Sequence, residues 1–325
     1  MVSTKVLPTT SAAEKSALPD GKFRLVGWDV DATGQMVTDE ICQLAAYTPQ
    51  EDFSQYIMPY KDLTLFAQRR YMMYTKTIGR YRALKDKTNN KMLRTKSEIS
   101  ALVDFLMWLE KIKNQEPGCT GLILLCHDAI ELAPLLLIQA LKRYDLLDRF
   151  ASIVKGFSNC YAFVKLKCES SVTSFTLKTL SKILLDKEDE QTHSARNRAR
   201  IAYQLVQHLR AGLVEPSSGG GGGALVSDLG DLAQFTWTVG DKEATVAPRL
   251  EQLQRLMSLR PLFRSGVAAA AGVEEKSGGG GGTFRRPSMQ ERRRAVQLRS
   301  QLLDAMIDYE MLSKTWSERE PVLHS

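Results

Sequence analysis

Three short polar motifs constrain the fold of this chain more than any other feature of its sequence. They are Asp29-Val-Asp31, which closes the apolar run 23–30, His127-Asp128, which closes the apolar run 121–126, and His193-Ser-Ala-Arg-Asn-Arg198 at the start of a helical pattern. The second run is unbroken, which is typical of a buried strand, and a parallel sheet gathers ligands at the carboxyl ends of its strands. The motifs therefore predict an α/β domain with polar side chains clustered at one edge of its sheet.

In order and spacing, the motifs resemble those of the DEDD-type 3′-5′ exonucleases, which carry D-x-E, N-x-x-x-D and H-x-A-x-x-D. Four carboxylates of that family hold two divalent ions on the scissile phosphate. In this chain Asp31 replaces the glutamate, and Leu132 and Arg198 fall on the third and fourth acids. Leucine cannot ligate a hard cation, and a guanidinium opposes two dications. The resemblance implies a ribonuclease H-like mixed sheet flanked by helices, with no catalysis, no metal and no cofactor.

The degenerate site consists of Asp29, Asp31, Leu132, His193 and Arg198. Without metal ions, Asp29 and Asp31 would repel each other, so we expect the Arg198 guanidinium to act as their counter-charge. His193 then has no metal-bound water to deprotonate. Two alternatives stay open: a weak nuclease that uses Asp29, Asp31 and Asp128 with one metal, and a protein-interaction adaptor without RNA contact.

Longer segments resemble the exuperantia family of insect maternal mRNA localisation factors, over 23–59, 96–111 and 141–155. The resemblance is specific over 22–212 and looser over 225–316. It implies RNA binding, homodimerisation through the exonuclease-like domain, ribonucleoprotein transport proteins as partners, and germline ribonucleoprotein granules as the location. It also implies a small all-helical SAM-like module after the first domain, whose completeness stays open because the chain ends soon after Trp316.

Composition agrees with a polyanionic partner in a reducing compartment. The chain has a formal charge of +7 and a pI near 9.1, although a mildly basic protein without such a partner has the same values. Its five cysteines include no C-x-x-C pair. The amino terminus lacks the apolar core of a signal peptide, and the longest apolar stretch is too short to span a bilayer. We therefore predict a cytoplasmic protein without membrane contact.

The predicted organisation follows the shifts in composition. Residues 1–21 are expected to form a disordered leader, 22–214 the exonuclease-like domain, 215–223 a glycine-rich linker, 224–317 the helical region and 318–325 a tail. The helical region contains a flexible insert at 266–283. Its glycine run 278–282 and the earlier run 219–223 are either natural linkers or shortened loops.

Periodicity predicts the main elements. We expect strands at 23–30, 41–48, 53–58 and 121–126. One helix should begin near Leu132, a second near Ser174, and a third should span 194–209. A further helix should follow Thr95, because Thr95 and Glu98 match a capping box. Amphipathic helices are expected from Pro248, as a first-turn proline, and from Met289.

Two basic segments are candidates for RNA, either single-stranded or in structured mRNA 3′ regions. The candidate contacts are Arg69, Arg70, Lys76, Arg80, Arg82, Lys85, Lys87 and Lys91 in the first segment, and Arg285, Arg286, Arg292, Arg293 and Arg294 in the second. Tyr71, Tyr74 and Tyr81 interleave with the first set, which suits base stacking on single strands. Solvated helix faces carry similar charge runs. Ser288 follows Arg285-Arg286-Pro287, a pattern typical of basophilic kinase sites, and is a candidate phosphorylation site.

Overall fold

The computed structural model describes residues 15–188, 190–211, 225–258, 298, 301, 302, 307, 311, 312 and 314. The chain divides into two units at Val246. The candidate site lies in the first unit. Among the described residues, none of the helices has the length and apolar character needed to cross a membrane.

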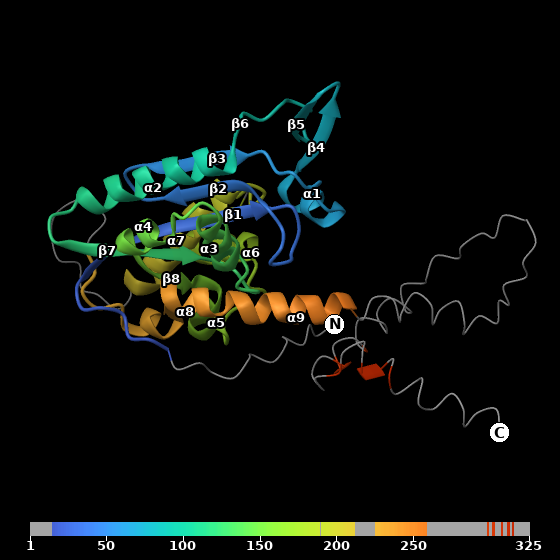
Figure 1. Cartoon of the computed structure of the whole chain (residues 1–325). Helices are drawn as coiled ribbons and strands as arrows, with labels where there is room; N and C mark the ends of the chain where they lie inside the picture. Colours follow the sequence, from blue (N-terminus) through green and yellow to red (C-terminus); the bar gives the residue numbers. More distant parts are fainter. Residues whose placement is uncertain are drawn as a thin grey trace, which may run out of the picture. The chain divides into compact units, whose positions relative to one another are not determined.

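A seven-stranded mixed sheet forms the centre of the first unit (Figure 1). The strands lie in the order β6-β3-β2-β1-β7-β8-β9, with bounds β1 Lys22–Ala32, β2 Ile41–Tyr47, β3 Asp52–Ile57, β6 Thr95–Lys96, β7 Cys119–Cys126, β8 Val154–Asn159 and β9 Thr236–Thr238. β1, β2 and β3 form an antiparallel meander, whereas β1, β7 and β8 are parallel neighbours. The four predicted strands are therefore present, and the carboxyl ends of β1 and β7 lie side by side.

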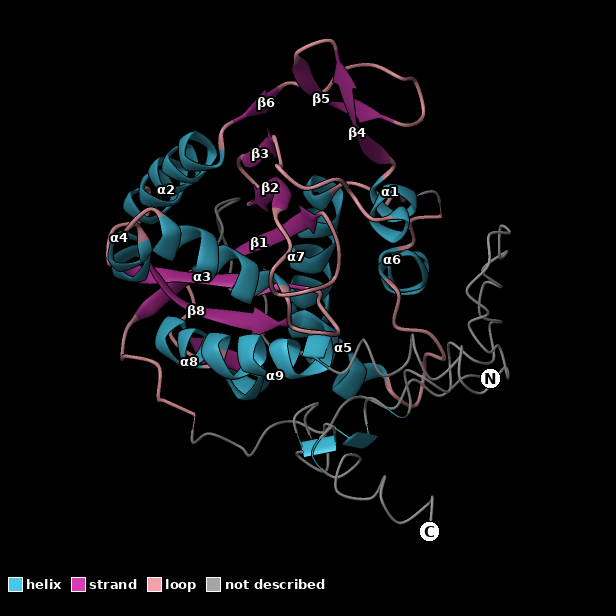
Figure 2. Cartoon of the chain, turned by 45° about the vertical axis from the view of Figure 1, so that its right-hand side comes forward, coloured by secondary structure: helices cyan, strands magenta, loops and turns pink. Residues whose placement is uncertain are grey.

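Helices cover both faces of this sheet (Figure 2). One face carries α2 (Glu98–Asn114), α3 (Ala133–Arg143) and α4 (Leu147–Ile153), and the other α5 (Cys160–Cys168), α6 (Leu177–Leu185) and α7 (Ala195–Ala211). Phe23, Leu25 and Ile123 pack with the α5–α7 layer in one continuous core. Both faces of β7 are buried, which explains why its sequence is an unbroken apolar run rather than an alternating one.

A second, two-stranded sheet stands apart from the first (Figure 1). It is a hairpin of β4 (Met73–Ile78) and β5 (Tyr81–Asp86), and it follows α1 (Leu65–Tyr71) directly. Gly79 opens its two-residue turn with φ +61°, a conformation that favours glycine at this position. Met73 and Leu84 anchor the base of the hairpin in a small core with Cys42, Leu63 and Ala67.

Residues 225–246 belong to the first unit and not to a separate helical region. They comprise a 3-10 turn (Gly230–Phe235), β9 and α8 (Val239–Ala244). β9 pairs antiparallel with β8, and Val226 exchanges two backbone hydrogen bonds with Phe23. Leu229 and Leu232 are buried in the core of the α5–α7 layer. The compositional boundary predicted at 215–223 therefore does not coincide with the end of the sheet.

Three local predictions also differ from the structure. The helix after Thr95 is capped by Ser97, whose side chain accepts from the Ser100 amide, because Thr95 pairs with Tyr56 in the sheet. Residues 15–21, predicted as part of the leader, lie on the first unit: the Ser16 hydroxyl donates to Asp241 at 2.7 Å. α9 spans Val246–Ser258, so it begins before Pro248. Both glycine runs lie outside the described residues.

Candidate functional site

The period of β1 directs both carboxylates of the first motif toward α7. Phe23 and Leu25 belong to the core on the α7 side of the sheet, and Asp29 and Asp31 continue the same alternation. Gly27, which lies between Leu25 and Asp29 on the same face of the strand, lets α7 approach closely. A Cβ atom at this position would lie 2.1 Å from the Ala199 carbonyl oxygen. The strand and the helix are therefore held at a distance that a side chain can bridge.

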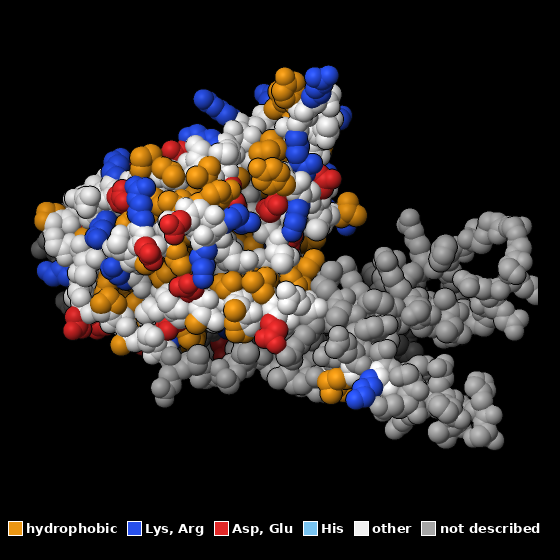
Figure 3. Space-filling model, in the orientation of Figure 1, with side chains coloured by type: hydrophobic (Ala, Val, Ile, Leu, Met, Phe, Trp, Pro, Cys, Tyr) orange, Lys and Arg blue, Asp and Glu red, His pale blue; other side chains and the backbone are white. Residues whose placement is uncertain are grey.

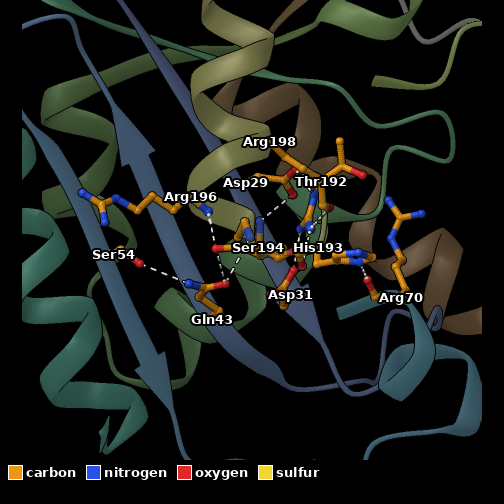
Figure 4. A network of polar contacts seen from close by, with 12 residues as sticks. Asp29, Asp31, Gln43, Ser54, Arg70, Thr192, His193, Ser194, Arg196 and Arg198 are labelled. Atoms are coloured by element: carbon orange, nitrogen blue, oxygen red, sulfur yellow. Dashed lines mark hydrogen bonds and ion pairs between the residues drawn. The ribbon is translucent and has the colours of Figure 1, made fainter. Parts of the chain in front are cut away.

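The amino terminus of α7 is fixed by a side chain from β2. Gln43 is buried, and its Oε1 accepts from the Ala195 amide at 3.1 Å and from the Ser194 hydroxyl at 3.3 Å. Its Nε2 donates to the Ser54 hydroxyl at 3.1 Å, which orients the amide (Figure 4). Amides of a first helical turn need such acceptors. Gln43 therefore determines where α7 begins, and with it the position of Arg198.

Arg198 reaches from α7 to both carboxylates (Figure 4). Its Nε donates to Asp29 Oδ2 at 2.8 Å, and its Nη2 donates to Asp31 Oδ1 at 2.5 Å. The guanidinium also donates to three carbonyl oxygens, those of Val30, Thr192 and His193, at 3.1–3.2 Å. Arg198 is 3% exposed and Asp31 is fully buried. The expected counter-charge is thus present as a buried ion pair shared between two acids.

One guanidinium does not balance two buried carboxylates. Burial raises the pKa of Asp31 to about 6, and its neighbour Arg198 only partly offsets this effect. Burial lowers the pKa of Arg198, but attraction to Asp29 and Asp31 outweighs burial and leaves it well above its usual value. Asp31 Oδ2 has no hydrogen-bond partner within the described part of the chain. Asp31 therefore takes up a proton more readily than an ordinary aspartate.

The second motif is used to start a helix. Asp128 Oδ2 accepts from the amides of Leu132 and Ala133 at 2.7 and 2.8 Å, and its Oδ1 accepts from the Ile130 amide at 3.0 Å. Both oxygens of Asp128 are thus committed to the beginning of α3. Glu131, the acid next to Leu132, points elsewhere: it accepts from Lys242 Nζ at 2.6 Å and from Asn159 at 3.0 Å.

These residues do not fit the two metal ions of the DEDD-type nucleases whose motifs they resemble. The guanidinium of Arg198 stands between Asp29 and Asp31, where a cation would bind, and Leu132 supplies no oxygen ligand. No cluster of three or more His, Cys, Asp or Glu side chains among the described residues is placed to hold a metal ion.

The two histidines of the motifs have different environments. His193 is exposed, and its Nδ1 donates to the Arg70 carbonyl oxygen at 3.1 Å. His127 is partly buried, and its Nε2 donates to the Phe175 carbonyl oxygen at 2.9 Å. Burial lowers the pKa of His127 to about 4, which the hydrogen bond to Phe175 offsets only in part. His127 is therefore neutral at physiological pH.

The first basic segment folds as α1, the hairpin and the loop that follows it, which we call the basic hairpin region (residues 69–94). Six of its eight candidate contacts are exposed, namely Arg69, Arg70, Lys76, Arg80, Lys87 and Lys91. Arg82 pairs with Asp62 at 2.6 Å and donates to the Pro59 carbonyl oxygen, and Lys85 is half-buried. Lysine and arginine side chains surround apolar ones on this part of the surface (Figure 3).

The three tyrosines of this segment are not equivalent. Tyr81, near the turn of the hairpin, is 81% exposed. Tyr74 donates its hydroxyl to Asn90 Oδ1 at 2.5 Å, and Tyr71 is half-buried under the Arg198 guanidinium, 5.3 Å from the ring centroid. Only Tyr81 is therefore free to stack on a base. Arg285, Arg286, Ser288 and Arg292–Arg294 lie outside the described residues.

Comparison with known proteins identifies the family. The family described as the exuperantia RNAse H-like domain matches residues 23–184. Maternal protein exuperantia of Drosophila virilis is 31% identical over 342 residues, which cover 95% of this chain and 66% of that protein. This chain is a homologue of exuperantia. The Drosophila melanogaster protein is 41% identical over 184 residues, 56% of this chain and 35% of its own length.

The mixed sheet with helices on both faces is therefore the RNase H-like domain of an exuperantia homologue. A solved full-length 3′-exonuclease has a similar chain course, with a TM-score of 0.41 and 14% identity over 65% of this chain and 93% of its own. The chain spans about two thirds of the Drosophila virilis relative and matches about a third of the others.

Two residues of the site were not predicted from the sequence. Gln43 has no motif, and its role depends on the pairing of β2 with β1, which brings it opposite Asp31. Tyr71 was predicted to contact RNA, but the ring covers Arg198 instead. Its position directly after Arg69-Arg70, where α1 ends, was the available signal.

Proposed function

We propose that this exuperantia homologue is an RNA-binding, homodimerising scaffold whose exonuclease-like domain does no chemistry. It would act in maternal mRNA localisation, with transport proteins, in cytoplasmic ribonucleoprotein particles, and the helical segments after Val246 would form a SAM-like module. The observation that carries the loss of catalysis is the ion pair of Arg198 with Asp29 and Asp31. It puts a fixed cation in the place where the related nucleases bind catalytic metals.

RNA binding is supported by the exposed charge of the basic hairpin region. Its six exposed cations are accompanied by a single acid within residues 69–94, the half-buried Asp86, and the exposed Tyr81 directly follows Arg80 in sequence. Phosphate neutralisation combined with stacking on one exposed ring is the usual way to hold unpaired RNA. The preferred ligand would therefore be single-stranded RNA or the loops of a structured 3′ region.

The experiment that tests the proposal incubates the purified full chain with end-labelled single-stranded RNA and manganese. A shifted band with intact RNA is the expected result. Degradation that Asp29→Asn abolishes would replace the scaffold by a weak nuclease. Neither shift nor degradation would favour a protein-interaction adaptor. Light scattering on the same sample should give twice the 36.4 kDa of one chain, and a single-chain mass would remove homodimerisation from the proposal.

Salt dependence locates the contact surface. If about five phosphates are neutralised, log Kd should change with log salt with a slope of magnitude about 3.5. Lys76→Gln with Arg80→Gln should reduce this slope by about 1.4, or about 0.7 for each lost contact. The matched control, Lys111→Gln with Lys165→Gln, changes net charge equally on α2 and α5 and should leave the slope unchanged. Equal slopes for both double variants would exclude the hairpin as the contact surface.

A further inference from the structure

The degenerate site and the basic hairpin region are in direct contact. The Arg198 guanidinium lies 5.3 Å from the centroid of the Tyr71 ring, and Tyr71 is the last residue of α1. Only Met72, with a left-handed φ of 53°, separates Tyr71 from the first residue of β4. The side chain that stands between the two carboxylates thus supports the residue from which the hairpin starts.

A second link joins the third motif to the same turn. His193 Nδ1 donates to the Arg70 carbonyl oxygen at 3.1 Å (Figure 4). The Arg70 guanidinium lies 5.7 Å from the Tyr71 ring centroid. Tyr71 is therefore contacted by one buried and one exposed guanidinium. The peptide that precedes it is tied to His193, two residues before the start of α7.

The hairpin needs such support, because an isolated two-stranded hairpin is only marginally stable in water. Its base contributes Met73 and Leu84 to a small core, on which the Tyr71 ring also packs. Toward the turn, Lys76, Ile78 and Tyr81 are exposed, so the tip gains no packing of its own. The direction in which the tip projects therefore depends on the contacts at its base, and Tyr71 links that base to Arg198.

We propose that Arg198 and Tyr71 are positioning residues for the basic hairpin: the arginine that replaces the metals holds the tyrosine, and the tyrosine fixes where the hairpin presents its cations. The degenerate site thereby fixes the position of the basic hairpin region. The part of this proposal that concerns RNA affinity rests on the function proposed above. The part that concerns the order of the hairpin does not.

Hydrogen exchange of the RNA-free full chain tests the positioning directly, with Tyr71→Leu compared with Tyr71→Phe. Neither substitution changes the net charge. We expect Tyr71→Leu to speed exchange of the hairpin amides, residues 73–86, about tenfold relative to those of β1 and β7, because loss of a desolvated cation–π contact typically has an effect of this order. Tyr71→Phe keeps the ring and should restore protection close to wild type. His193→Ala, a surface change that removes the second link, should give a smaller increase at the same amides.

A general loss of stability would act differently. Leu109→Ala opens a cavity on the opposite face of the sheet, so it should lower the melting temperature without changing the ratio of hairpin to core exchange. In RNA titrations, Tyr71→Leu should weaken binding about fivefold with an unchanged salt slope, whereas Tyr71→Phe should stay within about twofold. Equal hairpin exchange in Tyr71→Leu and Tyr71→Phe would overturn the positioning role. Failure of the wild type to bind RNA would remove the proposed function and leave the exchange result to decide this inference.

Discussion

The buried ion pair makes Arg198→Ala the most informative stability variant. The substitution leaves Asp29 and Asp31 facing each other without their cation and removes three hydrogen bonds to backbone carbonyls. Removing one member of a buried charged pair costs about 3–5 kcal/mol. Protonation limits the cost: neutralising one carboxyl at pH 7 from its unperturbed pKa of 3.8 takes about 4 kcal/mol. We therefore expect the free energy of unfolding to fall by about 4 kcal/mol.

Urea denaturation at pH 7 measures this loss, and Arg196→Ala is the matched control. Arg196 lies two residues earlier on α7 and pairs with Asp52 at the surface, with 58% of its side chain exposed, so its removal should cost less than about 1 kcal/mol. Adding Asp31→Asn to Arg198→Ala should restore at least about 2 kcal/mol, because the orphaned charge is gone. Arg198→Asp should be less stable than Arg198→Ala in chelator and should recover with manganese. A loss for Arg198→Ala no larger than that for Arg196→Ala would refute the reasoning.

Two further perturbations test the neighbourhood of the pair. The raised pKa of Asp31 means that the folded state binds this proton more tightly than the unfolded state does, so about 3 kcal/mol of stability should be lost as pH rises from about 4 to about 6. The lowered pKa of His127 has the opposite effect, because the folded state binds the histidine proton less tightly. About 3 kcal/mol of stability should therefore be lost as pH falls from about 6.5 to about 4. Unfolding free energies measured over this range should therefore rise more steeply with pH than wild type in Asp31→Asn and less steeply in His127→Gln, and curves parallel to wild type would show that neither group titrates as described. Gly27→Ala should lower the free energy of unfolding by about 3 kcal/mol, because its methyl group would meet the Ala199 carbonyl oxygen at 2.1 Å; a thermal melt like that of the wild type would mean that α7 can retreat without cost.

The parts of the fold that could be predicted are those in which local sequence and tertiary environment agree. β1 and β7 are buried on both faces, so their apolar runs identify them. Position within the motifs also placed Arg198 opposite Asp29 and Asp31, because a strand of period two and the first turn of a helix leave few other directions for these side chains. Leu132 supplies no oxygen ligand, and Glu131 points away from the site toward Lys242 and Asn159, as the sequence predicted.

The remaining features depend on partners that are distant in sequence. Thr95 and Ser97 are both good capping residues, and the pairing of Thr95 with Tyr56 decides between them. The hairpin was not predicted because its buried residues are few and charges surround them, although the Gly79-Arg80 turn was a usable signal. β9 is three residues long and becomes a strand only beside β8.

The edge strand β9 also determines how this protein can be dissected. The glycine run 219–223 invites a truncation that keeps only the residues before it, and such a fragment would lose β9 together with Leu229 and Leu232. β8 would then present an unpaired edge next to an uncovered apolar surface, which is the arrangement that leads strands of separate molecules to join. Self-association of such a fragment would result from the truncation and would not test the homodimerisation proposed above. A fragment for biophysical work should therefore extend through Val246.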